Sequence, residues 1–264
     1  MPTVEVIGTA QDAGVPHIGC HCDHCESART SEEQQRYATA VLLSDGGEYL
    51  FDATPDIRFQ ISTVPDGVFL THAHLGHLPG LLFFGQEAAN AERTPVYAAE
   101  GLNDVIRNSP PLNLLIKQDN LTLNDFSSHA SVEFNDVRVE SHSVEHRESL
   151  PTDTLAYMIE GPNRSLLYMT DIDEWNPTTQ QLVEQADIAL VDGTFWSESE
   201  LKRTEEVPHP YVKDSIRKLD PERTEIYFTH LNHTNPLLNR NSSEYDRIKN
   251  AGFDIASSGT KFKL

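Results

Sequence analysis

The segment Thr71-His72-Ala73-His74-Leu75-Gly76-His77 constrains this chain most, because it places three histidines within six positions directly after an apolar run. Neutral imidazole is the most common protein ligand for zinc, iron and similar ions. In an extended segment, residues two apart point the same way, so His72 and His74 can converge on one ion. Gly76 lets the chain turn, and His77 can then approach from a third direction. The pattern predicts a metal site at the carboxyl end of a β-strand rather than three solvated loop histidines.

Other predicted strands also end in potential metal ligands. These strand-end residues are His72, Asp171, Asp192 and His230. His146 follows a further strand, and His233 lies three residues after His230. Asp171 is the better candidate to bridge two ions, whereas Asp173 is equally suited to cap a helix. Side chains presented from strand ends can build one site on a rigid scaffold.

All three cysteines fall within six residues, at Cys20, Cys22 and Cys25. An odd number this closely spaced is a poor disulfide framework and is typical of thiolate metal ligands. The C-x-C-x-x-C spacing suits a tetrahedral zinc that lacks one ligand, which a histidine must supply. Either His21 or His24 could do so within a strained loop, or a remote histidine could connect two parts of the chain and stabilise the fold. Buried free thiols are the alternative.

The chain of 264 residues has no Pro/Gly/Ser-rich linker, so we expect a single domain over residues 1–264. Alternating and apolar runs predict strands at 3–9, 38–43, 48–53, 68–71, 96–98, 121–123, 131–134, 137–142, 155–160, 165–170, 188–192, 225–229 and 253–256. Helices are predicted from residue 80 to about residue 91 and at 101–108, 178–186, 212–219 and 243–251, with a loop over 10–26. This order predicts two sheets faced by outer helices.

The net charge of −21 opposes binding to nucleic-acid phosphates and to anionic membrane surfaces. No run of about 18 apolar residues predicts a membrane span, and the first residues lack the basic and apolar regions of a signal peptide. We therefore expect a cytoplasmic protein that acts on a small-molecule substrate, with no nucleic-acid or membrane partner. Assembly as a homodimer is left open.

A strand followed by T-H-x-H-x-x-H, a mid-chain histidine, an acid after an apolar strand and a late Thr-His together resemble the metallo-β-lactamase superfamily. The resemblance implies an α/β fold, an αββα sandwich of two mixed sheets with outer helices and a metal centre along one edge. Four stretches are more specifically similar to the pyrroloquinoline quinone biosynthesis protein B group. They are Gly8-Thr9-Ala10 through the cysteines, Pro55-Asp56-Ile57-Arg58, Asp192-Gly193-Thr194-Phe195-Trp196 and His230-Leu231-Asn232-His233-Thr234-Asn235-Pro236. The cysteine loop and late histidines are also similar to the cyclic phosphodiesterase of phosphonate breakdown.

The resemblance implies a role for each candidate residue. The active-site ligands would be His72, His74 and His146 for a first metal, Asp171 as the bridge, and His77 and His230 for a second metal. The structural zinc would be held by Cys20, Cys22, Cys25 and His233. His209, in Val207-Pro208-His209-Pro210, falls where the phosphodiesterase relatives place a histidine that touches the substrate, although the sequence alone is equally compatible with a packed loop residue.

Two departures from these families affect the interpretation. Gly76 stands where the superfamily motif H-x-H-x-D-H has an aspartate, so we expect the second metal site to be weak or empty. Hydrolysis is not excluded, because one well-held ion suffices for Lewis-acid catalysis. The H-x-H pair of His72 and His74 is intact here, whereas the cofactor-biosynthesis protein commonly lacks it, so a role in making that cofactor does not transfer directly.

These observations lead to three hypotheses. The leading one is an enzyme, a metallo-hydrolase of a small anionic ester such as a phosphodiester. In this hypothesis Asp171 orients a metal-activated water, and His209 stabilises the developing oxyanion or protonates the leaving group. The second is a mononuclear iron oxygenase or hydroxylase in quinone-cofactor biosynthesis, since histidines plus one carboxylate also suit Fe²⁺. The third is a non-catalytic, metal-stabilised binding protein. We expect Zn²⁺ at the structural site and one or two ions of Zn²⁺, Fe²⁺ or Mn²⁺ at the active site.

Overall fold

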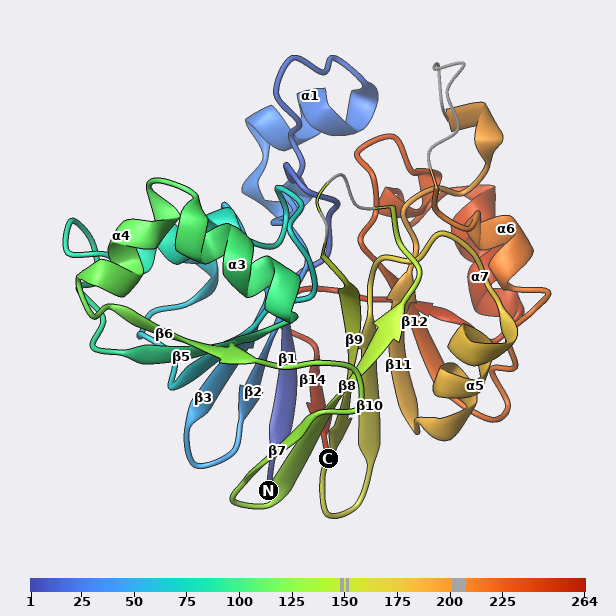
Figure 1. The fold of residues 1–264 in the computed structure, drawn as a ribbon. Helices are drawn as coiled ribbons and strands as arrows, with labels where there is room; N and C mark the ends of the chain where they lie inside the picture. The colour runs from blue at the N-terminus through green and yellow to red at the C-terminus, as the bar shows by residue number, and fades with distance from the viewer. Residues whose placement is uncertain (148–149, 151, 201–207) are drawn as a thin grey trace.

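Two seven-stranded β-sheets pack face to face in the computed structural model, with helices on their outer faces (Figure 1). The structure describes residues 1–147, 150, 152–200 and 208–264. The strand orders are β14-β1-β2-β3-β4-β5-β6 in the first sheet and β13-β12-β11-β10-β9-β8-β7 in the second. The predicted αββα sandwich of two mixed sheets is therefore confirmed.

The first sheet changes from antiparallel to parallel at β3. Its strands are β1 (Thr3–Gly8), β2 (Ala40–Ser44), β3 (Glu48–Phe51), β4 (Gly67–Phe69), β5 (Thr94–Ala98), β6 (Leu121–Asp125) and β14 (Lys261–Lys263). Pairing is antiparallel from β14 to β3 and parallel from β3 to β6. The carboxyl ends of β3 and β4 consequently lie side by side.

The second sheet has the same mixed character. Its strands are β7 (Ser131–Phe134), β8 (Val137–Val144), β9 (Thr154–Glu160), β10 (Ser165–Met169), β11 (Ile188–Asp192), β12 (Glu225–Thr229) and β13 (Asp254–Ile255). Pairing is antiparallel from β7 to β10 and parallel from β10 to β13. The carboxyl ends of β10, β11 and β12 therefore meet at one edge of this sheet.

Helices cover the outer face of each sheet and the end of the sandwich that lies opposite the two termini. The helices are α1 (Asp23–Thr30), α2 (Ile57–Gln60), α3 (Glu100–Asn108), α4 (Leu112–Lys117), α5 (Pro177–Gln185), α6 (Val212–Ser215) and α7 (Ser243–Asn250), with short 3₁₀ turns η1 (Glu32–Gln34), η2 (Pro79–Phe84), η3 (Glu198–Glu200) and η4 (Pro236–Leu238). In Figure 1, α3 and α4 flank the first sheet, α5, α6 and α7 flank the second, and α1 lies above the strand ends.

Several elements differ from the sequence predictions. The helix predicted over residues 80–91 is only the 3₁₀ turn η2, because Gly85 ends it in an extended conformation and turns follow. The segment predicted as a loop over residues 10–26 already forms α1 from Asp23 onward, and the patterns predict neither α4 nor β14. The regular part of α6 ends at Ser215, four residues before the predicted end.

Aromatic side chains fill the space between the two sheets. Phe51 and Phe69 stack with ring centroids 4.7 Å apart, and Tyr157 from the second sheet meets Phe51 edge-on at 5.4 Å. Burying one such side chain stabilises a fold by about 1.5–3 kcal/mol. Tyr168 is also fully buried, and its hydroxyl donates to the carboxylate of Asp52 at 3.0 Å. This core therefore supports the strand ends that carry the candidate ligands.

Candidate metal centre

Four of the predicted ligands meet at the edge between the two sheets. His72, His74, His146 and Asp171 each offer one ligand atom, and these atoms all lie within 4.8 Å of one another. Nε2 of His72 lies 2.9 Å from Nδ1 of His74 and 3.8 Å from Oδ1 of Asp171. Nε2 of His146 lies 3.9 Å from the same carboxylate oxygen. The loops after β4, β8 and β10 thus bring together the set predicted for the first metal.

The two histidines predicted for a second metal also lie beside Asp171. Nε2 of His77 is 3.6 Å from Oδ2 of Asp171, and Nε2 of His230 is 3.5 Å from its Oδ1. The carboxylate of Asp171 therefore lies within 3.9 Å of nitrogen atoms from both histidine groups, so it could serve as a ligand to both. A third residue that the sequence reasoning missed, Asp12, forms a group with His77 and His230 whose ligand atoms also lie within 4.8 Å.

The protonation state of these side chains suits a divalent cation. Burial lowers the pKa of His72 well below its ordinary value, and burial also lowers that of His146 and His230. Burial opposes ionisation of Asp171, but the nearby imidazoles, His230 first among them, hold the pKa of its carboxyl well below the usual range. His72, His146 and His230 are therefore neutral imidazoles beside a carboxylate, which is the donor set that zinc, iron and manganese accept.

Unpartnered nitrogen atoms give an independent test of the fit. The Nε2 atoms of His77, His146 and His230 are buried without a hydrogen-bond partner among the described residues. A buried polar atom left in this state costs about 1–3 kcal/mol. Coordination of a metal ion would satisfy these atoms, so the residues present fit the group that the sequence predicts.

Asp52 orients His77 from behind. Oδ1 of this fully buried carboxylate accepts hydrogen bonds from the backbone N–H of Thr71 at 2.8 Å and from its hydroxyl at 2.9 Å, while Oδ2 lies 2.8 Å from Nδ1 of His77. Burial lowers the pKa of His77, but the carboxylates of Asp52 and Asp171 outweigh this and raise it to about 9. A proton held on Nδ1 leaves Nε2 directed at Asp171. The signal that could have found Asp52 is its place directly after a buried strand.

Asp192 holds His209 in the same way. Oδ2 of Asp192 lies 2.7 Å from Nδ1 of His209, and Oδ1 accepts from the hydroxyl of Thr194 at 2.8 Å. Burial lowers the pKa of His209, but Asp192 raises it to about 9. The ring of His209 lies 5.1 Å from that of His146 and 5.8 Å from that of His230. The expectation that Asp192 is itself a potential ligand is therefore wrong, because its carboxylate positions His209 instead.

Asp173 neither joins a ligand group nor caps a helix. Its Oδ1 lies 3.2 Å from Nδ1 of His146 and accepts from the backbone N–H of Arg147 at 2.9 Å. The N-cap of α5 is Asn176, whose side chain accepts from the backbone of Thr179. Asp173 therefore orients His146 from its outer side.

The three cysteines converge on one remote histidine. Cys20, Cys22, Cys25 and His233 form a group with ligand atoms within 4.8 Å of one another. Nδ1 of His233 lies 3.3 Å from Sγ of Cys20, although 213 residues separate the two in the chain. We call these four residues the cysteine clasp.

The two local histidines are engaged elsewhere. His21 is exposed and pairs with Glu26 at 2.6 Å, and Nδ1 of His24 lies 3.1 Å from the carbonyl oxygen of His233. Burial lowers the pKa of His233 to about 4, so its imidazole is neutral and available as a ligand. The geometry thus favours the remote histidine over both local ones.

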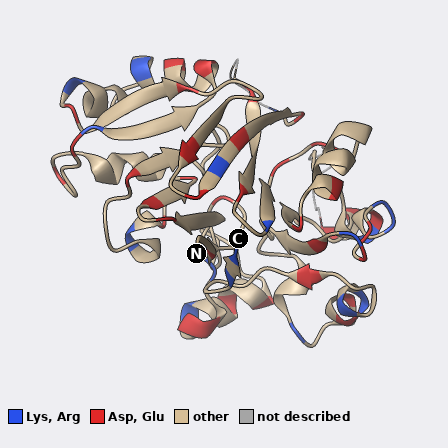
Figure 2. Ribbon diagram, turned by 90° about the horizontal axis from the view of Figure 1, so that it is seen from below, with Lys and Arg blue, Asp and Glu red and all other residues tan. Residues whose placement is uncertain are grey.

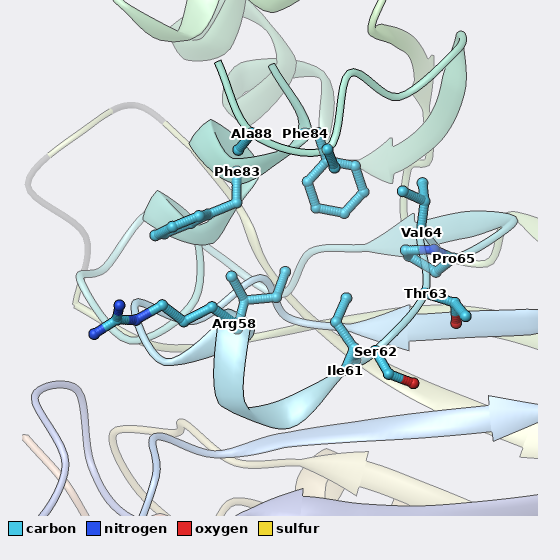
Figure 3. Close-up of a pocket in the computed structure, with 11 residues that line it drawn as sticks. Arg58, Ile61, Ser62, Thr63, Val64, Pro65, Phe83, Phe84 and Ala88 are labelled. Carbon is cyan, nitrogen blue, oxygen red and sulfur yellow. The ribbon is translucent and has the colours of Figure 1, made fainter. Parts of the chain in front are cut away.

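Two cavities are candidate binding sites. An apolar one of about 240 Å³ lies between α2 and η2, lined by Arg58, Ile61, Phe83 and Phe84 among others (Figure 3). None of its lining residues belongs to a ligand group, and it is smaller than the roughly 300–1,000 Å³ typical of ligand pockets. A second cavity, of about 680 Å³, is lined by Asp12, Phe195 and Glu200 as well as by residues of the cysteine clasp. Because Asp12 also lies beside His77 and His230, this second cavity opens next to the metal centre.

All predicted site residues lie within the described part of the chain. Val207, which was quoted only as a neighbour of His209, lies outside it. Within that part, no helix has the length and apolar character needed to cross a bilayer.

Comparisons with known proteins identify the family of this chain. Residues 48–230 match the family described as the beta-lactamase superfamily domain. Coenzyme PQQ synthesis protein B from Methylobacillus flagellatus is 27% identical, covering 97% of this chain and 98% of the relative. The protein of the same name from Methylococcus capsulatus is 25% identical and covers 99% of both chains.

Solved structures show the same fold. Zinc-bound PqqB from Methylobacterium extorquens aligns over 99% of this chain and 100% of its own with a TM-score of 0.85 at 22% identity. A structure described as a new diphosphatase from the PhnP family aligns over 100% of this chain and 97% of its own with a TM-score of 0.74 at 26% identity. Together, the fold, the ligand groups and these relatives support divalent metal binding. The chain belongs to the beta-lactamase superfamily, in the group that resembles coenzyme PQQ synthesis protein B.

Proposed function

We propose that this chain is a metal-dependent hydrolase of a small anionic ester of the phosphodiester class. The observation that carries the proposal is the arrangement of five imidazoles around Asp171 with His209, whose pKa is raised to about 9, beside them. The 26% identical structure described as a diphosphatase of the PhnP family supports the choice of a phosphate ester.

The residues at the centre divide the work of hydrolysis. His72, His74 and His146 would hold a divalent ion, which supplies Lewis acidity and a water that ionises near neutral pH when it is bound. Asp171, placed between the two histidine groups, can accept a hydrogen bond from the attacking water and orient it toward the ester.

His209 is suited to serve as the general acid. Hydrolysis forms a bond from the water oxygen to phosphorus and breaks the ester P–O bond, so the leaving oxygen needs a proton. Asp192 and Thr194 occupy the Nδ1 side of His209, which leaves Nε2 to donate that proton. Before proton transfer, the same cationic ring attracts the negative phosphate group.

The cavity of about 680 Å³ offers room for a small molecule beside these groups. Its lining residue Phe195 lies 6.0 Å from the ring of His209, centroid to centroid, which connects the cavity to the proposed acid. A volume in this range fits a small organic phosphate.

The test is turnover of a phosphodiester panel by protein whose metal content is known. Protein loaded with Zn²⁺, Fe²⁺ or Mn²⁺ under anaerobic conditions is assayed with bis(4-nitrophenyl) phosphate, cyclic nucleotides and alkyl phosphodiesters. We expect turnover that disappears with chelation and returns when the metal is added back. Absence of turnover across the panel with the centre demonstrably loaded would falsify the proposal.

A second candidate function is oxygen-dependent chemistry on a quinone-cofactor precursor. Two observations favour it: the curated relatives are named coenzyme PQQ synthesis protein B, and the active-site donors are imidazoles and carboxylates, which also suit Fe²⁺. Oxygen consumption coupled to loss of a precursor in the iron-loaded protein supports this candidate. A protein that is indifferent to oxygen whichever metal it carries excludes it.

A further inference from the structure

The histidine motif of this chain lacks its own carboxylate, because Gly76 stands at the position of the superfamily aspartate. In the structure, another residue occupies the space that a side chain at this position would take. A Cβ atom at Gly76 would lie 2.9 Å from Cα of Asp12 and 3.1 Å from its Oδ1. The backbone N–H of Gly76 donates to that same oxygen at 3.0 Å. Glycine at position 76 thus makes room for an aspartate that arrives from a different part of the chain.

The carboxylate of Asp12 reaches the two histidines that lack an anionic ligand of their own. Asp12, His77 and His230 offer ligand atoms within 4.8 Å of one another. Nε2 of His77 and Nε2 of His230 are buried and have no hydrogen-bond partner among the described residues. The unpartnered atoms therefore lie where a cation shared with Asp12 would satisfy them.

The backbone around Asp12 is fixed in this position. Asp12 has a φ of +31°, in the left-handed region that is unfavourable for residues other than glycine. Such a conformation persists only where the surrounding structure enforces it. The backbone N–H of the preceding residue, Gln11, donates to the carbonyl oxygen of Leu231 at 3.0 Å. The backbone N–H of Leu231 in turn donates to the carbonyl oxygen of Thr9 at 2.8 Å. The loop after β1 is thus attached to the segment that begins with His230, so the carboxylate and this imidazole are held together.

We propose that Asp12 replaces the aspartate missing from the histidine motif and is the anionic ligand of a second active-site metal ion. His77 and His230 supply its imidazole ligands, and Asp171 bridges it to the first ion. This inference rests on the metal centre of the proposed function, and it replaces the expectation that Gly76 leaves the second site weak or empty. The site offers two imidazoles and two carboxylates, a set without thiolates that suits Zn²⁺, Mn²⁺ or Fe²⁺.

The experiment compares Asp12→Asn with Asp12→Ala by metal analysis and by titration of the apoprotein with Zn²⁺ and with Co²⁺, whose absorption reports each site. Asparagine keeps the oxygen that accepts from Gly76 and removes only the charge. We expect wild-type protein to bind three ions, counting the cysteine clasp, and both variants to bind the third at least about 10-fold more weakly. Asp153→Asn is the matched control, because this exposed acid near the start of β9 has no described interaction, and it is expected to bind like wild type.

Each outcome separates this inference from the hydrolase proposal. If Asp12 only supports the turn at Gly76, Asp12→Asn keeps all three ions at wild-type affinity and only Asp12→Ala loses one, which overturns the inference. Wild-type protein that binds no more than the clasp ion and one other ion also overturns it, while leaving hydrolysis on one ion intact. Loss of the third ion in Asp12→Asn supports the inference even where no phosphodiester is turned over.

Discussion

Single buried carboxylates set the orientation of the histidines in this centre. Asp52 directly follows β3 of the first sheet and Asp192 is the last residue of β11 in the second. The carboxylate of Asp52 lies 2.8 Å from Nδ1 of His77, and that of Asp192 lies 2.7 Å from Nδ1 of His209. In both cases the carboxylate outweighs the effect of burial and raises the imidazole pKa to about 9. The two sheets thus use the same arrangement, in which one carboxylate positions His77 for the ion that Asp12 is proposed to bind and another positions His209 for the proposed substrate.

His209→Gln separates substrate chemistry from metal binding. Glutamine cannot protonate a leaving group, so we expect kcat to fall by about 10²–10⁴-fold, the usual contribution of a general acid. The metal content should stay at the wild-type value, because His209 is assigned to the substrate and not to an ion. Loss of an ion in this variant would contradict the assignment, and His129→Gln, at an exposed histidine, is expected to leave kcat unchanged.

Asp52→Asn tests the support behind the metal ligands. Asp52 accepts from Thr71, from His77 and from the hydroxyl of Tyr168, all of them buried. An amide at this position must turn its NH₂ group toward one of these donors, so we expect a loss of about 1–3 kcal/mol in the free energy of unfolding. Urea unfolding of the chelated protein measures this loss without the contribution of the ions. A variant as stable as Asp153→Asn would show that Asp52 is dispensable.

The sequence pointed to the histidines of the centre and to Asp171, but not to Asp12 or Asp52. His72, His74 and His77 lie in one short motif, so local spacing was enough to group them. Asp12 and Asp52 reach the centre through tertiary packing, and no local pattern links them to the motif. A buried strand ending in an acid is a usable signal for Asp52, whereas Asp12 becomes apparent only when the space beside Gly76 is seen in three dimensions.

At the level of elements, strands were predicted better than short helices. Alternation and apolar runs identify strands because each sheet is buried on its inner face. The helix predicted after residue 80 is wrong because close packing governs this segment: a Cβ at Gly80 would lie 2.3 Å from the carbonyl oxygen of Thr54. Leu82 and Phe83 of this segment are exposed in the structure. Packing of this kind has no counterpart in a one-dimensional pattern.

The cysteine clasp joins α1 to the segment that follows β12, so its removal should affect stability more than catalysis. Cys20→Ser/Cys22→Ser is expected to lose one zinc ion and to keep the ions of the histidine groups. Since about 1 kcal/mol shifts Tm by roughly 2–4 °C in a chain of this size, we expect Tm to fall by several degrees. Metal analysis and thermal unfolding measure the two effects, with His21→Gln as the control that keeps the zinc. An unchanged zinc content in the double variant would contradict the assignment of the clasp.

For the whole molecule, the dominant property is the negative charge. The chain carries a net charge of −21, and Figure 2 shows its acidic residues spread over many elements. Binding of three divalent ions would still leave the net charge of the protein strongly negative. A field of this sign repels nucleic acid and lowers the local concentration of any anionic substrate. The proposed function therefore predicts that kcat/KM depends on ionic strength, which is not expected for a neutral substrate.

We expect kcat/KM for an anionic phosphodiester to rise several-fold between low and physiological ionic strength. The Debye length falls from about 30 Å at 0.01 M to about 8 Å at 0.15 M, so the distant acidic surface is screened first. The positive charge of His209 and the ions lies within a few ångströms of the substrate and keeps its attraction. Rates with bis(4-nitrophenyl) phosphate are compared at several concentrations of potassium chloride with those of a neutral ester hydrolysed at the same centre, which should change little. A fall in kcat/KM with salt would instead show that the centre itself steers anions inward against the charge of the whole molecule.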